Sequence, residues 1–477
     1  RRLYAALVHE VASEGSDARQ VLFTSRSGKV FPDLGVGAAL VEAGGLSSNA
    51  GMVFQGVKLV GDGFLVPPEQ HAEWIASCPE WKRFLPQLVA GSDLTKRRPP
   101  RYCLDFFGLD SDAARAAFPQ GFQKILSDVK PFRVQSKDKF FRENWWLFGR
   151  GRGDMRHAIS SLRRYIVTSE VSKHRFFTFL DKKETLADGS LAVVALEDKF
   201  SLGILTSRLH VCWALAQGGR MGAGNDSRWQ NGPCFLNFPF PSASRDQADR
   251  IRDLADRISA HRNQQMGAHP ELTLTNVYNV LEKLHAGESI RDKPKEKAVY
   301  EQGLIGLLKE LHDELDRAVF EAYGWPDLAD KLTGRPGATT PLPDKPADQA
   351  EAEEELLMRL VALNKQRAEE EAQGVVRWLR PDYQAPDAVQ AEVDIASKAA
   401  VAKPESTINK GKATFPKAIP EQLRVLREAL AERSHTTESL AELFKRKPRK
   451  SVEEGLRSLA AVGVAEFETE TQTWHTV

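Results

Sequence analysis

The chain has 477 residues, of which 42% are hydrophobic and 27% are charged, with 66 Lys and Arg against 65 Asp and Glu. This length exceeds one ordinary hydrophobic core, so we expect two to four domains with the composition of a soluble globular protein. No run of about eighteen apolar residues is present, which predicts no membrane span, and the four cysteines form no Cys-x-x-Cys pair, which fits a reducing cytoplasm.

The first 45 residues carry weak β-type signals. Short strand patterns occupy Leu3–Val11 and Gln20–Phe23. The Gly35-Val36-Gly37 segment follows no clear strand and lacks a third glycine, so a turn is favoured over a nucleotide site. The chain begins without an initiator methionine or an apolar signal core, so we expect a part of a longer gene product.

Residues 46–241 alternate strand and helix patterns, which predicts an α/β or α+β domain. Glycine-bounded β runs around 51–64 indicate a hairpin. The further predictions are a helix in Glu69–Val89, a strand at Arg101–Phe107, a helix at Ala113–Val129, strands at Leu191–Leu196 and Leu202–Leu205, and a helix at Ser207–Gln217.

A concentration of positive charge lies within this domain. Between Lys130 and Arg175 there are twelve Lys and Arg but four Asp and Glu, interleaved with Phe, Tyr and the pair Trp145-Trp146. Such a surface suits a polyanion, because the cations neutralise phosphates. At least one of the two tryptophans is expected in the core instead. The predicted phosphate-binding residues are Lys130, Arg133, Arg150, Arg152, Lys173 and Arg175.

A polar loop over residues 220–231 offers side chains that can contact base edges. Asn and Gln match adenine, Arg matches guanine, and Asp accepts from cytosine in the major groove. Composition alone favours an ordinary surface loop as the alternative. The candidate base-reading residues are Arg220, Asn225, Asp226, Arg228, Gln230 and Asn231.

No self-sufficient catalytic constellation is found. The His-Glu-x-x-His, P-loop and Gly-x-Ser-x-Gly patterns are absent. Glu197-Asp198-Lys199, with Asp181 or Asp188 upstream, has the shape of a metal-dependent nuclease site, but charges at strand ends are commonly just solvated. The His312, Asp313, Glu314 and Asp316 group on one predicted helix is likewise expected to be a solvated face rather than a metal site. No catalytic or metal-binding residue is assigned.

In the C-terminal half the strand patterns give way to apolar residues at helical spacing. We expect a helical domain at 242–333, a proline-containing linker at 334–348, a helical segment at 349–384 and a flexible linker at 385–415. Residues 416–477 show three short helix patterns followed by a hairpin, the order of a winged helix.

An ordered series of motifs resembles the Mme-type (type IIL) DNA methyltransferases, including relatives in DISARM-like phage-defence systems. The resemblance covers roughly residues 45–383. The motifs are Phe54-Gln55-Gly56, Gly61-Asp62-Gly63-Phe64, Lys130-Pro131-Phe132-Arg133, Trp145-Trp146, Ser172-Lys173-His174-Arg175, Leu205-Thr206-Ser207-Arg208-Leu209-His210, Phe238-Pro239-Phe240-Pro241, Leu272-Thr273-Leu274-Thr275-Asn276 and Ala322-Tyr323-Gly324-Trp325.

The resemblance implies a function for the chain. In that family an adenine-N6 methyltransferase domain using S-adenosylmethionine precedes a target-recognition domain and a helical C-terminal region, and some members carry a nuclease. Residues 46–241 would be the recognition domain, in which the loop before Phe238 carries base-reading positions, and this favours Asn225, Asp226 and Arg228. The family's cofactor glycines and Asn-Pro-Pro-Tyr motif have no counterpart here, so residues 1–45 would be the remnant of a catalytic domain.

The chain is therefore expected to be the DNA-recognition part of a site-specific adenine methyltransferase in a restriction–modification or phage-defence system, inactive by itself. Its expected partners are double-stranded DNA and an upstream catalytic domain. The alternative is a non-catalytic DNA-binding regulator built around the winged-helix-like residues 416–477. For this tail an accessory DNA contact and a protein-docking role remain equally open.

Overall fold

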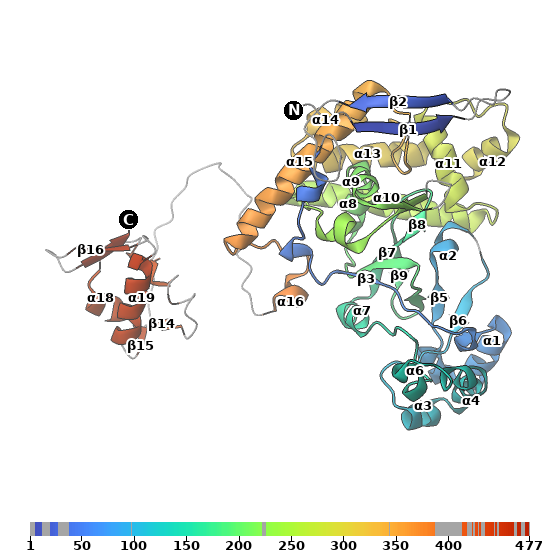
Figure 1. The fold of residues 1–477 in the computed structure, drawn as a ribbon, viewed down its shortest axis with the longest axis horizontal. Coiled ribbons are helices and arrows are strands. Elements are labelled where there is room, and N and C mark those ends of the chain that lie inside the picture. Colours follow the sequence, from blue (N-terminus) through green and yellow to red (C-terminus); the bar gives the residue numbers. More distant parts are fainter. Residues whose placement is uncertain are drawn as a thin grey trace. The chain divides into compact units, whose positions relative to one another are not determined.

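The computed structural model in Figure 1 divides the chain into two compact units, Arg1–Ala396 and Ser397–Val477. Within the ranges described, no helix is both long and apolar enough to cross a membrane. All four cysteines are free thiols. The structure describes residues 5–11, 20–26, 38–96, 98–221, 226–342 and 344–386, and in the second unit 413–416, 422, 425–427, 429–430, 435–442, 444–445, 448–461, 465–468 and 473–476.

The first unit is a mixed α/β structure whose central strands are short. An antiparallel pair is formed by β1 (Ala5–Val11) and β2 (Gln20–Arg26). Three further sheets have the strand orders β10-β5-β6-β4, β3-β11-β7-β9 and β12-β13-β8. Their bounds are β3 (Val53–Gln55), β4 (Leu65–Val66), β5 (Gln87–Val89), β6 (Arg101–Cys103), β7 (Arg164–Ser169), β8 (Val171–Ser172), β9 (Thr178–Asp181), β10 (Thr185–Ala187), β11 (Leu191–Val194), β12 (Gly219–Met221) and β13 (Asp226–Arg228).

Burial on both faces explains the composition of the two central strands. Strand β11 has the sequence Leu-Ala-Val-Val and all four residues are buried, while five of the six residues of β7 are buried. Because neither strand has a solvent face, both lack the alternation of polar and apolar residues that a half-exposed strand shows.

Short helices surround these sheets. They are α1 (Pro68–Ser77), α2 (Gly91–Thr95), α3 (Ser111–Ala117), α4 (Pro119–Asp128), α5 (Lys130–Arg133), α6 (Lys139–Glu143), α7 (Gly153–Ala158), α8 (Lys199–Thr206) and α9 (Arg208–Gln217). The single helix expected at Ala113–Val129 is split, because Phe118 has an extended backbone (φ −148°, ψ 80°) before Pro119. A residue before proline is disfavoured in the helical region.

Two other sequence expectations in this region are wrong. Leu202–Leu205 was expected as a strand, but it lies in helix α8, whose first turn is capped by Asp198 accepting from the Ser201 N–H at 2.8 Å. The helix is buried nearly all round, and a short apolar run does not distinguish a buried helix from a buried strand. The helix expected over Glu69–Val89 ends at Ser77 and is followed by a 3-10 segment and strand β5.

Longer helices form the rest of the first unit. They are α10 (Arg245–Ala268), α11 (Leu274–His285), α12 (Pro294–Gln302), α13 (Ile305–Tyr323), α14 (Pro326–Leu332), α15 (Ala347–Ala372) and α16 (Pro381–Gln384). Ser244 starts α10 with a capping box, and Gly324 ends α13 in the left-handed region at φ 74°. In Figure 1, α10 lies between α8 and α13, and all three contribute to one apolar core.

The segment 334–348, expected as a linker, is built into the helical packing. Thr339 is 4% exposed. The carboxylate of Glu282 on α11 accepts from the backbone N–H groups of Gly337 and Thr339, each at 2.7 Å. The loop therefore has fixed partners, which the four prolines in its sequence did not indicate.

The chain after α15 fastens the helices to the sheets. Arg380 donates to the carbonyls of Ala158 and Ala195 at 2.7 and 2.9 Å. Gln384 on α16 donates to the carbonyls of Ser48 and Ala50, each at 2.9 Å. These acceptors lie far from residues 380–384 in the sequence. The segment after α15 therefore connects the helical part of the first unit to the region around β3 and β11.

Glu370 supports this connection, and its substitution should weaken the fold. Its carboxylate accepts from Arg367, Gln366 and Arg377. Burial acts to raise the pKa of Glu370, but these hydrogen bonds outweigh it and lower the pKa to about 2, from an ordinary 4.5. Glu370→Gln should therefore lower the free energy of unfolding by about 2–3 kcal/mol at pH 7.

The pH dependence of this effect has a defined sign. A depressed pKa contributes stability above about pH 4.5 that is lost as pH falls towards 2. Urea denaturation of both proteins between pH 7 and pH 3 should show the difference shrinking with acid. A difference that stays constant over this range would mean that the Glu370 charge does not provide the stability.

The second unit contains α18 (Thr437–Glu442), α19 (Arg449–Ala461) and the antiparallel hairpin of β16 (Ala465–Glu468) and β17 (Thr473–Thr476). A parallel pair is formed by β14 (Ala413–Thr414) and β15 (Phe444–Lys445). The small hydrophobic core of the second unit includes Leu440, Leu456 and Trp474. The helix–helix–hairpin order agrees with the sequence pattern, while the winged-helix assignment stays a prediction. The expected flexible linker at 385–415 lies largely outside the described residues.

Candidate nucleic-acid interface

The sheet β12-β13-β8 carries the loop predicted to contact bases. Residues 222–225, with the candidate Asn225, and the side chain of Arg220 lie outside the described part of the structure. From β13 onward burial alternates: Ser227 and Trp229 are buried, at 4% and 1% exposure. The intervening candidates are partly exposed, namely Asp226, Arg228 and Gln230. Because side chains alternate along an extended strand, these three project from the same face.

Arg228 is held in place by an acidic partner on the neighbouring strand connection. Its Nε and Nη2 donate to Glu170 Oε1 at 3.0 and 2.7 Å, and the two side chains are 40% and 26% exposed. Glu170 lies between β7 and β8, and Trp229 N–H donates to its carbonyl at 2.8 Å. The guanidinium therefore has one fixed side against the protein and one side that faces solvent.

A cavity of about 250 Å³ opens beside this pair. Gln55 at the end of β3 donates to the Gly189 carbonyl at 2.8 Å and accepts from Arg152 Nη2 at 2.5 Å. Three segments that are remote in sequence thus supply one polar wall. Its polar lining consists of Gln55, Glu170, Arg228, Gln230 and Asn231.

Arg175, a predicted phosphate contact, is instead an internal support of β13. It is 2% exposed, and its guanidinium donates to the Ser169 and Ser227 carbonyls, the latter at 2.9 Å, and to Ser227 Oγ at 3.0 Å. Burial lowers the pKa of Arg175 to about 10, so the side chain remains charged at neutral pH. The assignment fails because the side chain is buried and both terminal nitrogens of the guanidinium donate to acceptors inside the protein.

Arg133 is the second predicted phosphate contact that the structure contradicts. It is 4% exposed, and its Nη2 donates to the carbonyls of Leu59 and Val60, each at 2.8 Å. The guanidinium lies over the rings of Phe64 and Phe141 at 5.5 and 4.3 Å from their centroids. Burial lowers the pKa of Arg133. This arginine fixes a turn and is not available to a phosphate.

The other four basic candidates reach the surface to different degrees. Arg150 is exposed and its backbone pairs with that of Lys58, also exposed. Arg152 is half-buried by its contacts with Gln55 and the Gly56 carbonyl. Lys130 places its Nζ 4.9 Å from the ring centroid of Trp145. Trp145 is 8% exposed, which confirms the expectation that one of the paired tryptophans is buried.

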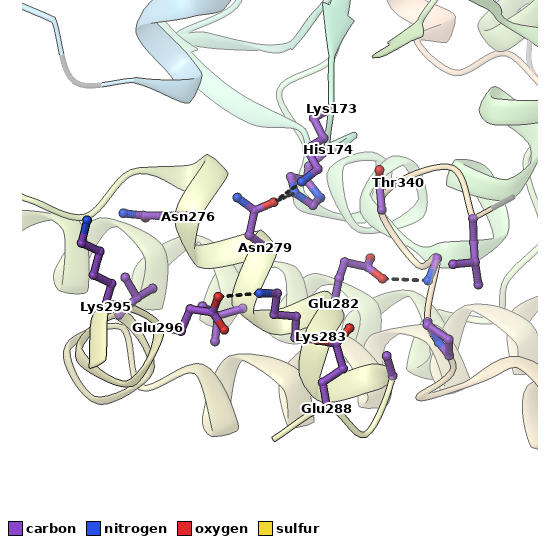
Figure 2. Close-up of a pocket in the computed structure, with 16 residues that line it drawn as sticks. Lys173, His174, Asn276, Asn279, Glu282, Lys283, Glu288, Lys295, Glu296 and Thr340 are labelled. Atoms are coloured by element: carbon purple, nitrogen blue, oxygen red, sulfur yellow. Dashed lines mark hydrogen bonds and ion pairs between the residues drawn. The ribbon is translucent and has the colours of Figure 1, made fainter. Parts of the chain in front are cut away.

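Lys173 lies apart from this group, at a cavity of about 570 Å³ beside α11 (Figure 2). Its Nζ donates to Asn279 Oδ1 at 2.6 Å, and the buried His174 contacts the same oxygen through Nε2 at 2.9 Å. Burial lowers the pKa of His174, against the opposing effect of Asn279. Figure 2 shows Lys173, Lys283 and Lys295 alternating with Glu282, Glu288 and Glu296, a mixed rim without a strong field of either sign.

Sequence reasoning missed Glu170 and Gln55, which line the cavity beside Arg228 of β13. Glu170 had counted only as one of the few acids in a basic stretch. It lies 58 positions from Arg228 in the chain, and no local pattern connects the two. The Phe54-Gln55-Gly56 motif was a signal for Gln55, but not for its contact with Glu170 (3.4 Å).

The acidic groups weighed as catalytic sites have structural partners. Glu197 accepts from the Arg163 N–H at 2.9 Å, and Lys199 pairs with Asp256 at 2.6 Å. Asp181 and Asp188 accept from backbone N–H groups of their own turns. Across the described part of the chain, no group of three or more His, Cys, Asp and Glu side chains is arranged to hold a metal ion.

The acidic run on α13 is a solvated face only at Glu314, whose side chain is 49% exposed. His312, Asp313 and Asp316 are buried at 6%, 9% and 4% exposure. His312 Nε2 lies 3.0 Å from the Tyr278 hydroxyl, and Asp313 accepts from His285 and Lys309. Burial lowers the pKa of His312 to about 3. These groups form a polar network between helices.

The residues after β5 do not form a cradle for S-adenosylmethionine, the cofactor that the resemblance implies. Within residues 38–386, β5 and β10 pair in parallel, the arrangement whose carboxyl ends commonly provide a nucleotide crevice. Gly91 follows β5, but a Cβ atom there would lie 2.3 Å from Ser169 Oγ. Protein atoms fill that space, so these residues do not fit the cofactor.

Comparison with known proteins identifies a family model and a solved structure that this chain resembles. Residues 42–242 match the family described as "MmeI, target recognition domain". A solved structure of the type IIL restriction-modification enzyme MmeI in complex with DNA matches with a TM-score of 0.51 and 17% identity, over 76% of this chain and 45% of that one. At this identity the match concerns the fold.

A curated relative extends the comparison. DNA methyltransferase A of Bacillus subtilis (strain 168) is 31% identical over 116 residues, which are 24% of this chain and 12% of that protein. The chain thus spans less than half of the MmeI chain and about an eighth of this relative. The resemblance found in the sequence is confirmed for the part of the chain that matches: residues 42–242 correspond to the MmeI target recognition domain.

Proposed function

We propose that the target recognition domain binds duplex DNA and distinguishes its sequence through β13 and the loop before it. The observation that carries this proposal is the projection of Asp226, Arg228 and Gln230 from one face, where Arg228 and Gln230 line the 250 Å³ cavity. The cavity is smaller than the roughly 300–1,000 Å³ typical of small-molecule sites, which favours a base edge over a whole cofactor as its occupant.

Each side chain has a matching chemistry in the major groove. Arg228 can donate to guanine O6 and N7, Gln230 and Asn231 to adenine, and Asp226 can accept from cytosine N4. Glu170 holds one side of the Arg228 guanidinium, which orients the remaining donors before DNA arrives. Arg220 and Asn225 remain candidates for the same role.

Phosphate binding is assigned to the cations that reach solvent. These are Lys130, Arg150, Arg152 and Lys173, while Arg133 and Arg175 leave the set. Contacts of this kind are independent of sequence and weaken steeply with salt. They would set the register of the duplex so that the base-reading face meets its target.

The enzymatic context is proposed from the relatives. MmeI is described as a restriction-modification enzyme bound to DNA and the Bacillus protein as a DNA methyltransferase. We infer that this chain is the recognition part of a site-specific DNA methyltransferase acting in restriction–modification or phage defence in the cytoplasm. Adenine-N6 as the target and S-adenosylmethionine as the donor follow from the family resemblance. Extrusion of the adenine and transfer would take place in a catalytic domain, so the chain alone should bind DNA without methylating it.

A selection from a randomised duplex pool tests the proposal. The wild-type chain should enrich a short motif, and the Asp226→Lys/Arg228→Asp variant should change that motif at one position, since each mismatched contact costs about 1–3 kcal/mol. The matched control is Asp249→Lys/Arg252→Asp on α10, an exposed ion pair at 2.6 Å, which should leave the motif unchanged.

Other outcomes would contradict parts of the proposal. An unenriched pool bound with steep salt dependence would mean that the chain only holds phosphates. The alternative of a winged-helix regulator predicts loss of specific binding when residues 397–477 are deleted, whereas we expect most of it to survive. Robust methylation by the chain alone would overturn the assignment of catalysis to another domain.

A further inference from the structure

Phe132 stands out among the apolar side chains of the domain. It is 77% exposed, the largest exposed fraction among the large hydrophobic residues that the structure describes. The residues at the two ends of this short helix have the opposite character, since Val129, which precedes it, is 3% exposed and Arg133, its last residue, is 4% exposed. One aromatic ring thus projects from a turn that is buried at both ends.

The turn that presents this ring is firmly anchored. Pro131 occupies the first turn of α5, where its restricted φ suits the helix. The Arg133 guanidinium is bonded to the Leu59 and Val60 carbonyls, and Val134 N–H donates to the Lys130 carbonyl at 3.0 Å. A ring on a preorganised turn loses less conformational freedom on binding than one on a mobile loop.

The surroundings of Phe132 favour DNA as the occupant of this surface. Exposed Lys137, Lys139 and Arg142 follow the turn, and Lys130 precedes it. Further exposed apolar residues lie in the same subdomain, namely Val60, Val134 and Phe140 at 49%, 44% and 41%. Cations interleaved with exposed rings complement phosphates and base faces, whereas a purely apolar protein surface would leave these cations desolvated and unpaired.

This turn is connected to the base-reading cavity by one short segment. Gln55 lines the cavity, Lys58 pairs with Arg150 in both directions at 3.0–3.1 Å, and Val60 accepts from Arg133. The five residues from Gln55 to Val60 span at most about 17 Å, and the Arg133 side chain, bonded to Val60, adds to the separation between the cavity and the Phe132 turn. In Figure 1, α6, which follows the Phe132 turn in the chain, lies below β3 in the view.

We propose that the Phe132 turn is a DNA wedge, whose ring enters between base pairs that flank the recognised bases and unstacks them. Apolar side chains inserted in this way kink a duplex. The inference rests on the proposed function, because it requires that the chain bind duplex DNA. It goes beyond base reading, since Phe132 would act on the stacking of the duplex and not on a base edge.

The test is 2-aminopurine fluorescence in the complex of the whole chain with duplex DNA. The fluorescent base is moved position by position through the enriched sequence and its flanks, or through a fixed mixed sequence if none is enriched. Fluorescence should rise at one step, and Phe132→Ser should abolish the rise and weaken binding roughly tenfold, in the range of a lost aromatic stack. Phe132→Leu, which keeps an apolar wedge, should retain most of both effects.

One control and three outcomes separate the possible results. Leu307→Ser removes an apolar side chain of α13 that is 45% exposed and should change neither fluorescence nor affinity. DNA binding without an unstacked step, or a step that persists in Phe132→Ser, overturns the wedge and leaves the proposed function standing. Absence of any DNA binding by the wild-type chain overturns both.

Discussion

Replacement of Arg175 by methionine is expected to lower the free energy of unfolding by about 3 kcal/mol and to abolish sequence selection, although Arg175 touches no DNA in our proposal. Its guanidinium bonds the end of β7 to β13 through the Ser169 and Ser227 carbonyls. Methionine leaves both buried carbonyls without this donor. Since Ser227 lies between Asp226 and Arg228, the reading face would lose its support.

The cost of burying the Arg175 charge opposes the destabilisation expected for Arg175→Met. Burial lowers the pKa of Arg175 to about 10, which means that the folded protein already pays a desolvation cost for this charge. Replacing buried charges by apolar side chains is often neutral when all partners are replaced together. Here the partners are backbone carbonyls that no side-chain substitution removes, so the loss of the hydrogen bonds should dominate.

Urea denaturation and the pool selection together check this prediction. The control is Lys173→Met, the same kind of change two residues earlier at an exposed position, which should alter stability by no more than about 0.5 kcal/mol. If Arg175→Met were as stable as wild type but bound DNA with lower affinity and an unchanged motif, the residue would be a phosphate contact after all.

The helical region was the most predictable part of the fold. Ser244 and Thr273 begin α10 and α11 with capping boxes, and Gly324 ends α13. These signals are local, because a cap bonds to a backbone group within three residues. The strand error at Leu202–Leu205 has the converse reason: the choice between strand and helix depended on what covers the run, and its neighbours on α10 are about fifty positions away.

The recognition domain was predictable from the sequence, but the surroundings of its individual side chains were not. The basic, aromatic stretch and the polar loop both lie within residues 42–242, which match the MmeI target recognition domain. Whether a given arginine lies inside or outside depends on distant acceptors, such as Leu59 for Arg133 and Ser227 for Arg175. A guanidinium is chemically suited to either a phosphate or a cluster of carbonyls, so composition alone cannot distinguish these roles.

In the acidic run on α13, too, the sequence did not show which side chains are buried. We expect the largest effect of pH on the free energy of unfolding at this run. Asp316 is 4% exposed and its Oδ1 accepts from the Arg208 N–H at 2.7 Å. Burial raises the pKa of Asp316 to about 7, from an ordinary 3.8, and outweighs the hydrogen bond and the attraction of the Arg208 charge. Asp313 on the same helix adds to the increase, and His285 of α11 opposes it.

The sign of the effect follows from proton binding. Between about pH 4 and pH 7 the folded state holds a proton on Asp316 that the unfolded chain has lost, so stability falls as pH rises through this window. The shift corresponds to about 4 kcal/mol across the window. Asp316→Asn cannot ionise and keeps an acceptor oxygen for the Arg208 N–H.

Measuring the unfolding free energy of wild type and of Asp316→Asn at several pH values isolates the titration of Asp316, because both proteins share all other titrating groups. The unfolding free energy of Asp316→Asn minus that of wild type should increase by up to about 4 kcal/mol between pH 4 and pH 8, levelling off above pH 7. Asp313→Asn, the neighbouring buried carboxylate whose pKa is lowered, should give the opposite trend, with its stability deficit largest at neutral pH. A difference for Asp316→Asn that is flat with pH would mean that Arg208 keeps this carboxylate ionised, and that the α13 network is an ordinary buried ion pair.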